Sequence, residues 1–84
     1  MEKWDIAEIL KHDEKFRYQL LDRMRGDCLY FLGNGTRHEK YLWAGNVNDH
    51  IVYMKAIWKS FPLFGKPRWL SWRQIREFEK QMKN

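Results

Sequence analysis

The single cysteine and the three histidines are the residues of this chain with the widest chemical range. Cys28 and His38 are ten residues apart. They form the one Cys/His pair in which a histidine could act as the base that activates a cysteine nucleophile. Cys28, however, falls on the apolar face of a predicted helix, where a buried thiol packs as a small hydrophobic side chain. We therefore interpret Cys28 as a core residue rather than a nucleophile.

The other titratable side chains give no pattern that is typical of a metal or acid/base site. His12, His38 and His50 lack the three- or four-residue spacing that places two ligands on one helix face. Asp22 and Asp27 flank two arginines, an arrangement that indicates an ion-paired surface more than a pair of catalytic carboxylates. We expect no metal and no cofactor.

A glycine-containing segment at residues 33–36, GNGT, has the composition of a phosphate-binding loop. It follows a predicted helix, so it lies at a carboxyl end, where the helix dipole disfavours anions. The sequence thus excludes a Walker-type or dinucleotide site here. With no catalytic residue identified, we expect a protein that is not an enzyme.

The remaining functional signal is a set of cations near the C-terminus. At 100° per residue, four of them fall within an arc of about 80° on the last predicted helix, beside its apolar stripe. They are Arg73, Arg76, Lys80 and Lys83, and Lys66 and Arg68 precede the helix and would extend the patch. Two interpretations stay open: a solvated helix face, or a contact surface for phosphates or for an acidic protein.

Two tryptophans and four polar residues are further candidates for the core or for a contact surface. Trp69 follows a proline and neighbours the basic residues, so a surface anchor and a buried ring are equally compatible with its place. Trp43 is expected to be a core residue that fills the space between the helices. Four further polar residues are predicted to form an internal network that fixes the glycine turn against the long helix, with a partner-binding edge as the alternative; they are Asp22, Arg23, Asp27 and Arg37.

Helical periodicity predicts the elements that must position these residues, and no window shows sustained alternation of apolar and polar residues. We expect an all-α fold: one small compact helical domain, residues 1–84, with three main helices plus a short N-terminal helix. The expected helices are 4–11, with Trp4, Leu10 and either Ile6 or Ala7 facing inward; 13–32, stopped by the glycine turn; 46 or 48 to 61; and 71–82, with Ser71 and Gln74 as a capping box. Gly26, inside the second helix, indicates close packing by a ring or a kink. Residues 63–67 are expected to lack regular structure.

Length, composition and charge bound the function. Eighty-four residues suit one domain, one cysteine excludes a disulfide framework within the chain, and a mean hydropathy of −0.78 without a long apolar run excludes a membrane span. The net charge of +5 is uneven: residues 63–84 hold six Lys/Arg against two Asp/Glu, whereas residues 1–33 hold six against seven. We expect a cytoplasmic protein whose C-terminal third meets an acidic partner.

An ordered set of motifs resembles a large polyvalent protein-associated domain, a family found in proteins of phages and integrative elements. The similar segments are residues 20–37 (LLDRMRGDCLYFLGNGTR), 42–45 (LWAG), Met54, 61–62 (FP) and 66–72 (KPRWLSW), so the resemblance spans residues 16–82. The resemblance implies a mobile-element accessory protein and no active site. It makes a host protein or nucleoprotein complex the expected partner, in a bacterial host cell, with an anti-CRISPR-type inhibitor as the most concrete version. Low-specificity nucleic-acid binding through the last helix is the alternative.

Overall fold

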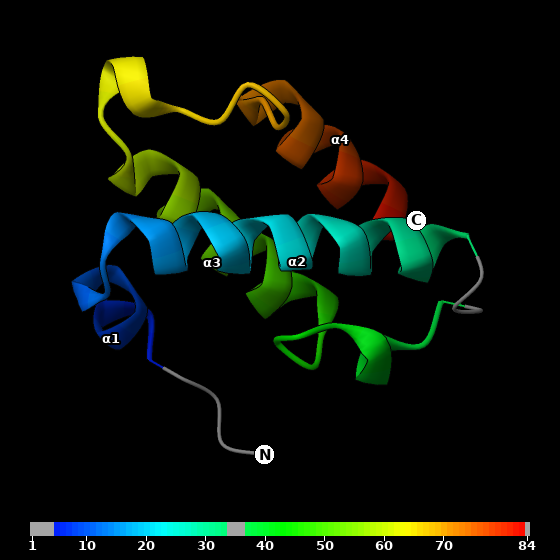
Figure 1. Cartoon of the computed structure of the whole chain (residues 1–84). Coiled ribbons are helices and arrows are strands. Elements are labelled where there is room, and N and C mark those ends of the chain that lie inside the picture. Colours follow the sequence, from blue (N-terminus) through cyan, green and yellow to red (C-terminus); the bar gives the residue numbers. More distant parts are fainter. Residues whose placement is uncertain (1–4, 34–36, 84) are drawn as a thin grey trace.

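The computed structural model describes residues 5–33 and 37–83 and confirms the all-α fold. Within these residues there are four α-helices and two short 3₁₀ turns, and Figure 1 shows how they are arranged. Their bounds are α1, Ile6–Lys11; α2, Glu14–Leu32; η1, Glu39–Tyr41; α3, Val47–Ser60; η2, Leu63–Gly65; and α4, Trp72–Met82.

Each α-helix begins where a side chain accepts a hydrogen bond from the first turn. Asp5, Asp13 and Asn46 cap α1, α2 and α3, and Asn46 rather than Asn48 is the cap of the third. Ser71 starts α4 with the predicted capping box: its hydroxyl accepts from Gln74 N–H at 3.1 Å, and Gln74 Oε1 accepts from Ser71 N–H at 2.8 Å. The starts of α2, α3 and α4 were readable from the sequence because a cap depends on local residues, whereas the first helix was predicted from residue 4 and begins at Ile6.

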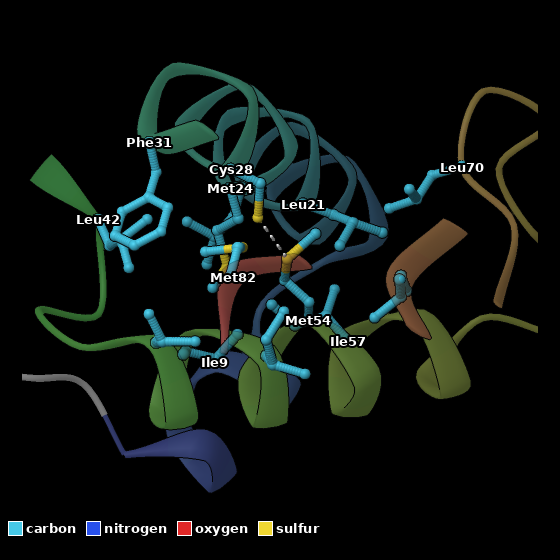
Figure 2. Packing of buried hydrophobic residues seen from close by; sticks show 14 of the residues in the cluster. Ile9, Leu21, Met24, Cys28, Phe31, Leu42, Met54, Ile57, Leu70 and Met82 are labelled. Atoms are coloured by element: carbon cyan, nitrogen blue, oxygen red, sulfur yellow. Dashed lines mark hydrogen bonds between the residues drawn. The ribbon is translucent and has the colours of Figure 1, made fainter. Parts of the chain in front are cut away.

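The core lies where α2 and α4 cross α3, with α1 docked on α3 as well. Figure 2 shows the apolar side chains that fill the space between these helices, including Cys28 on α2, whose Sγ lies 3.6 Å from Met54 Sδ on α3. The predicted stripes of α2 and α3 are confirmed, since their periodic apolar residues are buried; these are Leu20, Leu21, Met24, Cys28 and Phe31, and Val47, Ile51, Met54 and Ile57. Packing supplies the stability of the domain.

One carboxylate holds the connector between α2 and α3 in place. Asp27 Oδ2 accepts from the N–H of Trp43 at 2.9 Å, which holds the connector against the side of α2. The buried residues here are Leu42 and Ala44, at 3 % and 1 % exposed, whereas Trp43 is only half-buried. The prediction that Trp43 is a core residue is confirmed only in part, because the half-buried ring packs against the core cluster while Leu42 and Ala44 are the fully buried residues of this segment.

Two further expectations about local structure need correction. In α1 the inward residue is Ile9, which is fully buried; of the predicted residues Ile6 is half-buried, Ala7 and Leu10 are exposed, and Trp4 lies outside the described residues. A helix of six residues has too few apolar positions for their periodicity to define one buried face. Residues 63–65 form the turn η2 rather than irregular chain.

Gly26 shows neither the close packing expected of it nor a break in α2. A Cβ added there would meet no atom within 4 Å, the residue is exposed, and the helix is continuous from Glu14 to Leu32. Because glycine is unfavourable inside a helix, the sequence predicted a side chain packed closely against Gly26. The structure places no side chain there. Gly26 carries only the entropic cost of a flexible residue.

Gly26→Ala is therefore expected to raise the free energy of unfolding by about 1 kcal/mol, since alanine restricts the unfolded chain and clashes with nothing. Chemical denaturation followed by circular dichroism measures this change. Gly65→Ala is the contrasting variant: its Cβ would lie 2.8 Å from Cγ of the Pro62 ring, so we expect destabilisation by about 1 kcal/mol. A loss of stability in Gly26→Ala would contradict the assignment of open space.

Candidate functional site

The four cations predicted on the last helix lie together on the exposed face of α4. Arg73, Arg76, Lys80 and Lys83 are all exposed, and we call them the α4 strip. The opposite face is the apolar stripe of the same helix: Ile75 and Met82 are buried, while Trp72 and Phe78 are half-buried. The sequence placed these two faces correctly because an 11-residue helix keeps its periodicity.

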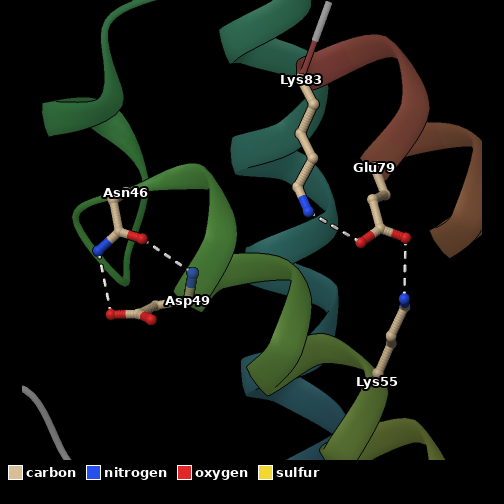
Figure 3. Close-up of polar contacts among 5 residues, drawn as sticks. All are labelled: Asn46, Asp49, Lys55, Glu79 and Lys83. Carbon is tan, nitrogen blue, oxygen red and sulfur yellow. Dashed lines mark hydrogen bonds and ion pairs between the residues drawn. The ribbon is translucent and has the colours of Figure 1, made fainter.

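Two carboxylates lie within the α4 strip. A shallow groove of about 540 Å³ runs along it, and Glu77 and Glu79 line this groove with all four cations. Glu79 joins two helices: its Oε1 lies 2.8 Å from Lys55 Nζ on α3, and its Oε2 lies 3.1 Å from Lys83 Nζ (Figure 3). Hydrogen bonds from Lys55 and Lys83 lower the pKa of Glu79 below its ordinary value. The strip is a mixed-charge surface with a cationic excess.

Two lysines of α3 extend this cationic surface, and the sequence analysis missed them. The Nζ atoms of Lys59 and Lys55 lie 4.9 and 5.8 Å from the centre of the Trp72 ring, beside the start of α4. Their spacing of four residues places them on one face of α3, a signal that was available. The contact between this face of α3 and α4 could not be predicted from the sequence.

Lys66 does not extend the patch as predicted. Its ammonium donates to the carbonyls of Trp58, Lys59 and Phe61, so it caps the carboxyl end of α3. It also lies over the Trp58 ring, 4.7 Å from the centroid. A cation at this position satisfies carbonyls that have no partner within the helix. Arg68 remains exposed, as a contact residue requires.

Trp69 belongs to the loop that leads to α4, but it lines a different groove from the α4 strip. It is half-buried, and its ring packs edge-on against Tyr18 with centroids 5.6 Å apart. The guanidinium of Arg25 lies 5.5 Å from the centre of the same ring. Trp69 and the α4 strip line different grooves, so they do not form the one binding surface that their closeness in sequence indicated.

The four polar residues expected to form one network contact different elements instead. Asp22 pairs with Arg25 one turn along α2, at 3.4 Å, and Asp27 holds the connector. Arg37, with a φ of 61°, donates to the carbonyls of Gln81 and Met82 and so caps the end of α4. Arg23 is exposed. Asp27 and Arg37 each satisfy backbone groups of the segment that packs beside them, so these contacts do not join the four residues into one network; residues 34–36 of the glycine turn lie outside the described residues.

Cys28 and His50 are titratable side chains that the structure buries in the core. Burial, with the nearby charge of Asp27, raises the pKa of the Cys28 thiol to about 12, so the thiol stays protonated and unreactive. His50 is fully buried on the core face of α3. Its Nε2–H donates to the Met24 carbonyl at 3.0 Å, and its Nδ1 accepts from Ala44 N–H at 3.5 Å. The sequence analysis missed this role, although position 50 falls on the apolar stripe of α3.

Within residues 5–33 and 37–83, no group of three or more His, Cys, Asp or Glu side chains is placed to hold a metal ion. None of the helices in the same residues is long and apolar enough to span a membrane.

The fold and the α4 strip define a small all-α module with a cationic helix face. The chain belongs to the large polyvalent protein-associated domain 11 family, whose model matches residues 14–82. This membership indicates a protein associated with phages or other mobile genetic elements. Neither the curated proteins nor the solved structures contain a match to the chain.

Proposed function

We propose that this chain is a non-catalytic binding module of a phage or mobile element, and that its α4 strip docks on an acidic surface of a host protein or nucleoprotein complex. In its most concrete form, the module is an anti-CRISPR-type inhibitor that acts in the cytoplasm of the bacterial host. The observation that carries the proposal is the α4 strip itself, four exposed cations on one face of an ordered helix.

The availability of these cations supports a binding role. Within the part of the chain that the structure describes, Arg73, Arg76 and Lys80 make no ion pair, whereas Lys83 pairs with Glu79. Three guanidinium or ammonium groups are thus free to meet carboxylates of a partner. Arginine is well suited to this task because its planar head binds carboxylates through two parallel hydrogen bonds.

The carboxylates within the strip favour a protein partner over bare nucleic acid. Glu77 and Glu79 line the same groove as the cations, so a phosphate backbone bound there would also meet two carboxylates that repel it. A protein surface of mixed charge can pair with both signs. Low-specificity nucleic-acid binding is the second candidate, supported by the cationic excess of the strip.

The test is affinity capture from host lysate with a charge-reversed variant. Arg76→Glu/Lys80→Glu is expected to reduce recovery of the wild-type partner about tenfold, because it turns attraction into like-charge repulsion. Lys11→Glu/Lys40→Glu is the matched control, since both lysines are exposed and lie outside the strip. Equal recovery by wild type and the strip variant would show that the strip is only a solvated face.

Nuclease treatment and salt separate the two partner classes. A protein partner should survive nuclease, and its affinity should fall less steeply with salt than that of a nucleic acid, because binding a protein releases no condensed counterions. A nucleic-acid partner should be lost with nuclease, with log K falling by about 0.9 per phosphate contact for each log unit of salt. For the inhibitor form, the wild-type chain should raise phage plating on a CRISPR-proficient host but leave plating on a CRISPR-deficient host unchanged.

A further inference from the structure

The most exposed apolar side chains of the described residues lie next to each other in η2. Phe64 is 99 % exposed and Leu63 is 79 % exposed, more than any other large apolar side chain in residues 5–33 and 37–83. We call this pair the 63–64 finger. In Figure 1, η2 (yellow) lies at the edge of the molecule. Two adjacent apolar side chains left in water are typical of a contact surface.

The finger is held by an ordered turn rather than by a loose loop. Gly65 N–H donates to the Pro62 carbonyl at 2.8 Å, which closes the turn around the two side chains. On one side, Phe61 is buried in the core, and on the other, Lys66 is fixed to the end of α3. A partner would therefore bind a finger whose backbone is already in place, which lowers the entropy lost on binding.

An aromatic groove lies beside the finger. It has a volume of about 770 Å³ and is open to solvent, with Tyr18 and Trp69 as its aromatic lining. The remaining lining residues are polar: Glu14, Lys15, Gln19 and Asp22. A Cβ added to Gly65 would lie 3.5 Å from Oε1 of Glu14, so the wall of the groove reaches η2 itself. Finger and groove are neighbours on one surface, and the finger leaves its own groove empty because Phe64 is exposed.

We propose that the chain forms a two-fold symmetric dimer in which the 63–64 finger of each copy inserts into the Tyr18/Trp69 groove of the other. A two-fold interface requires that the two complementary features lie on the same surface of one molecule, which this arrangement provides. In the dimer, the phenyl ring of Phe64 would contact the rings of Tyr18 and Trp69, whose planes lie at 77° to each other. This geometry allows a third ring to pack edge-to-face.

The charges at the two features are complementary as well. The groove carries Glu14 and Asp22 against Lys15, a net negative wall. The finger is followed along the chain by the exposed Arg68, whose guanidinium would lie near this wall in the paired copy, whereas the ammonium of Lys66 is held at the end of α3. The contact is independent of the α4 strip, which lines a separate groove. The strip thus stays available in the dimer for the partner proposed above.

The dimer should be weak. A buried phenylalanine removes roughly 150–250 Å² from water, so two fingers and two grooves give less than the ~800 Å² per partner of a standard interface. We therefore expect a dissociation constant on the order of 100 µM, equivalent to about −5.5 kcal/mol. Such a dimer forms at high local concentration.

Sedimentation equilibrium of the purified chain tests the proposal, over concentrations from about 10 µM to 1 mM that bracket this affinity. The wild type should shift from monomer toward dimer. Phe64→Ser should remain monomeric at every concentration and keep wild-type helicity, because the side chain makes no contact in the monomer. Glu14→Lys/Asp22→Lys, which reverses the groove wall, should weaken association about tenfold.

Leu29→Ser is the matched control, since Leu29 is also an exposed apolar residue, 51 % exposed, but lies at the far end of α2 from the groove. It should dimerise as the wild type does. In NMR spectra, the indole N–H signal of Trp69 should move with concentration in the wild type and stay fixed in Phe64→Ser. A wild type that is monomeric throughout, a dimer that Phe64→Ser leaves intact, or binding of the finger to phospholipid vesicles without dimerisation would each overturn the proposal.

Discussion

Phe61→Ala is expected to lower the free energy of unfolding by about 4 kcal/mol, within the range measured for buried phenylalanines. The side chain is 2 % exposed and lies at the end of α3, where the chain leaves the helix. Its ring packs edge-on against Tyr18 with centroids 4.9 Å apart, and the guanidinium of Arg17 lies 5.2 Å from its centre. Truncation would leave a cavity between α2 and α3 and remove both ring contacts.

The loss should be a large part of the total stability, since a domain of this size is stable by about 5–10 kcal/mol. Urea denaturation followed by helix signal gives the measurement. Phe64→Ala is the matched control, the same substitution three residues further along the chain at a side chain 99 % exposed, and it should change the free energy by less than about 0.5 kcal/mol. Equal effects of the two substitutions would contradict the placement of Phe61 in the core and Phe64 in solvent.

The second large effect concerns His50 and acid. Burial lowers the pKa of this imidazole below its ordinary value of 6.5, although the hydrogen bond to Met24 and the charge of Asp27 oppose the shift. In the unfolded chain the ring protonates as the pH falls below 6.5, whereas in the folded chain it stays neutral to a lower pH. The stability that His50 contributes is therefore complete above pH 6.5 and is lost as the pH falls from 6.5 toward the folded pKa.

The expected slope in this window is at most about 1.4 kcal/mol per pH unit, the value for one proton. Urea denaturation at pH 7.5, 6.5 and 5.5, about one unit apart, measures it. His50→Leu should cost about 3 kcal/mol at neutral pH, because Ala44 N–H and the Met24 carbonyl lose their buried partner, and it should remove the His50 contribution to the slope.

His38→Gln is the control for this experiment, since His38 is exposed and its loss should leave the stability at neutral pH near the wild-type value. Carboxylates also titrate at lower pH, so the comparison rests on the difference between His50→Leu and the wild type above pH 5 or so. A slope that persists unchanged in His50→Leu would assign the acid sensitivity to other groups.

The sequence by itself determined the helices and their caps. Asp13, Asn46 and Ser71 act on the first turn that follows them, so the start of each helix depends on residues within four positions. The apolar stripes of α2, α3 and α4 follow from the same local periodicity, and with them the exposure of the α4 strip. The resemblance in the motifs likewise led to the correct family, because it depends on the order of residues along the chain.

Only the tertiary structure decided which predicted site residues act together. Lys66 and Arg37 were expected at a binding surface or in one network, but they cap α3 and α4, since a cation is drawn to carbonyls that packing brings within reach. Trp69 lies near the α4 strip in sequence but faces Tyr18 across the chain, and His50 meets Met24 from 26 residues away. Such contacts depend on how helices cross, which no local pattern encodes. The sequence of a helix determines which of its faces is apolar. The elements that pack against the helix determine which groups its polar side chains contact.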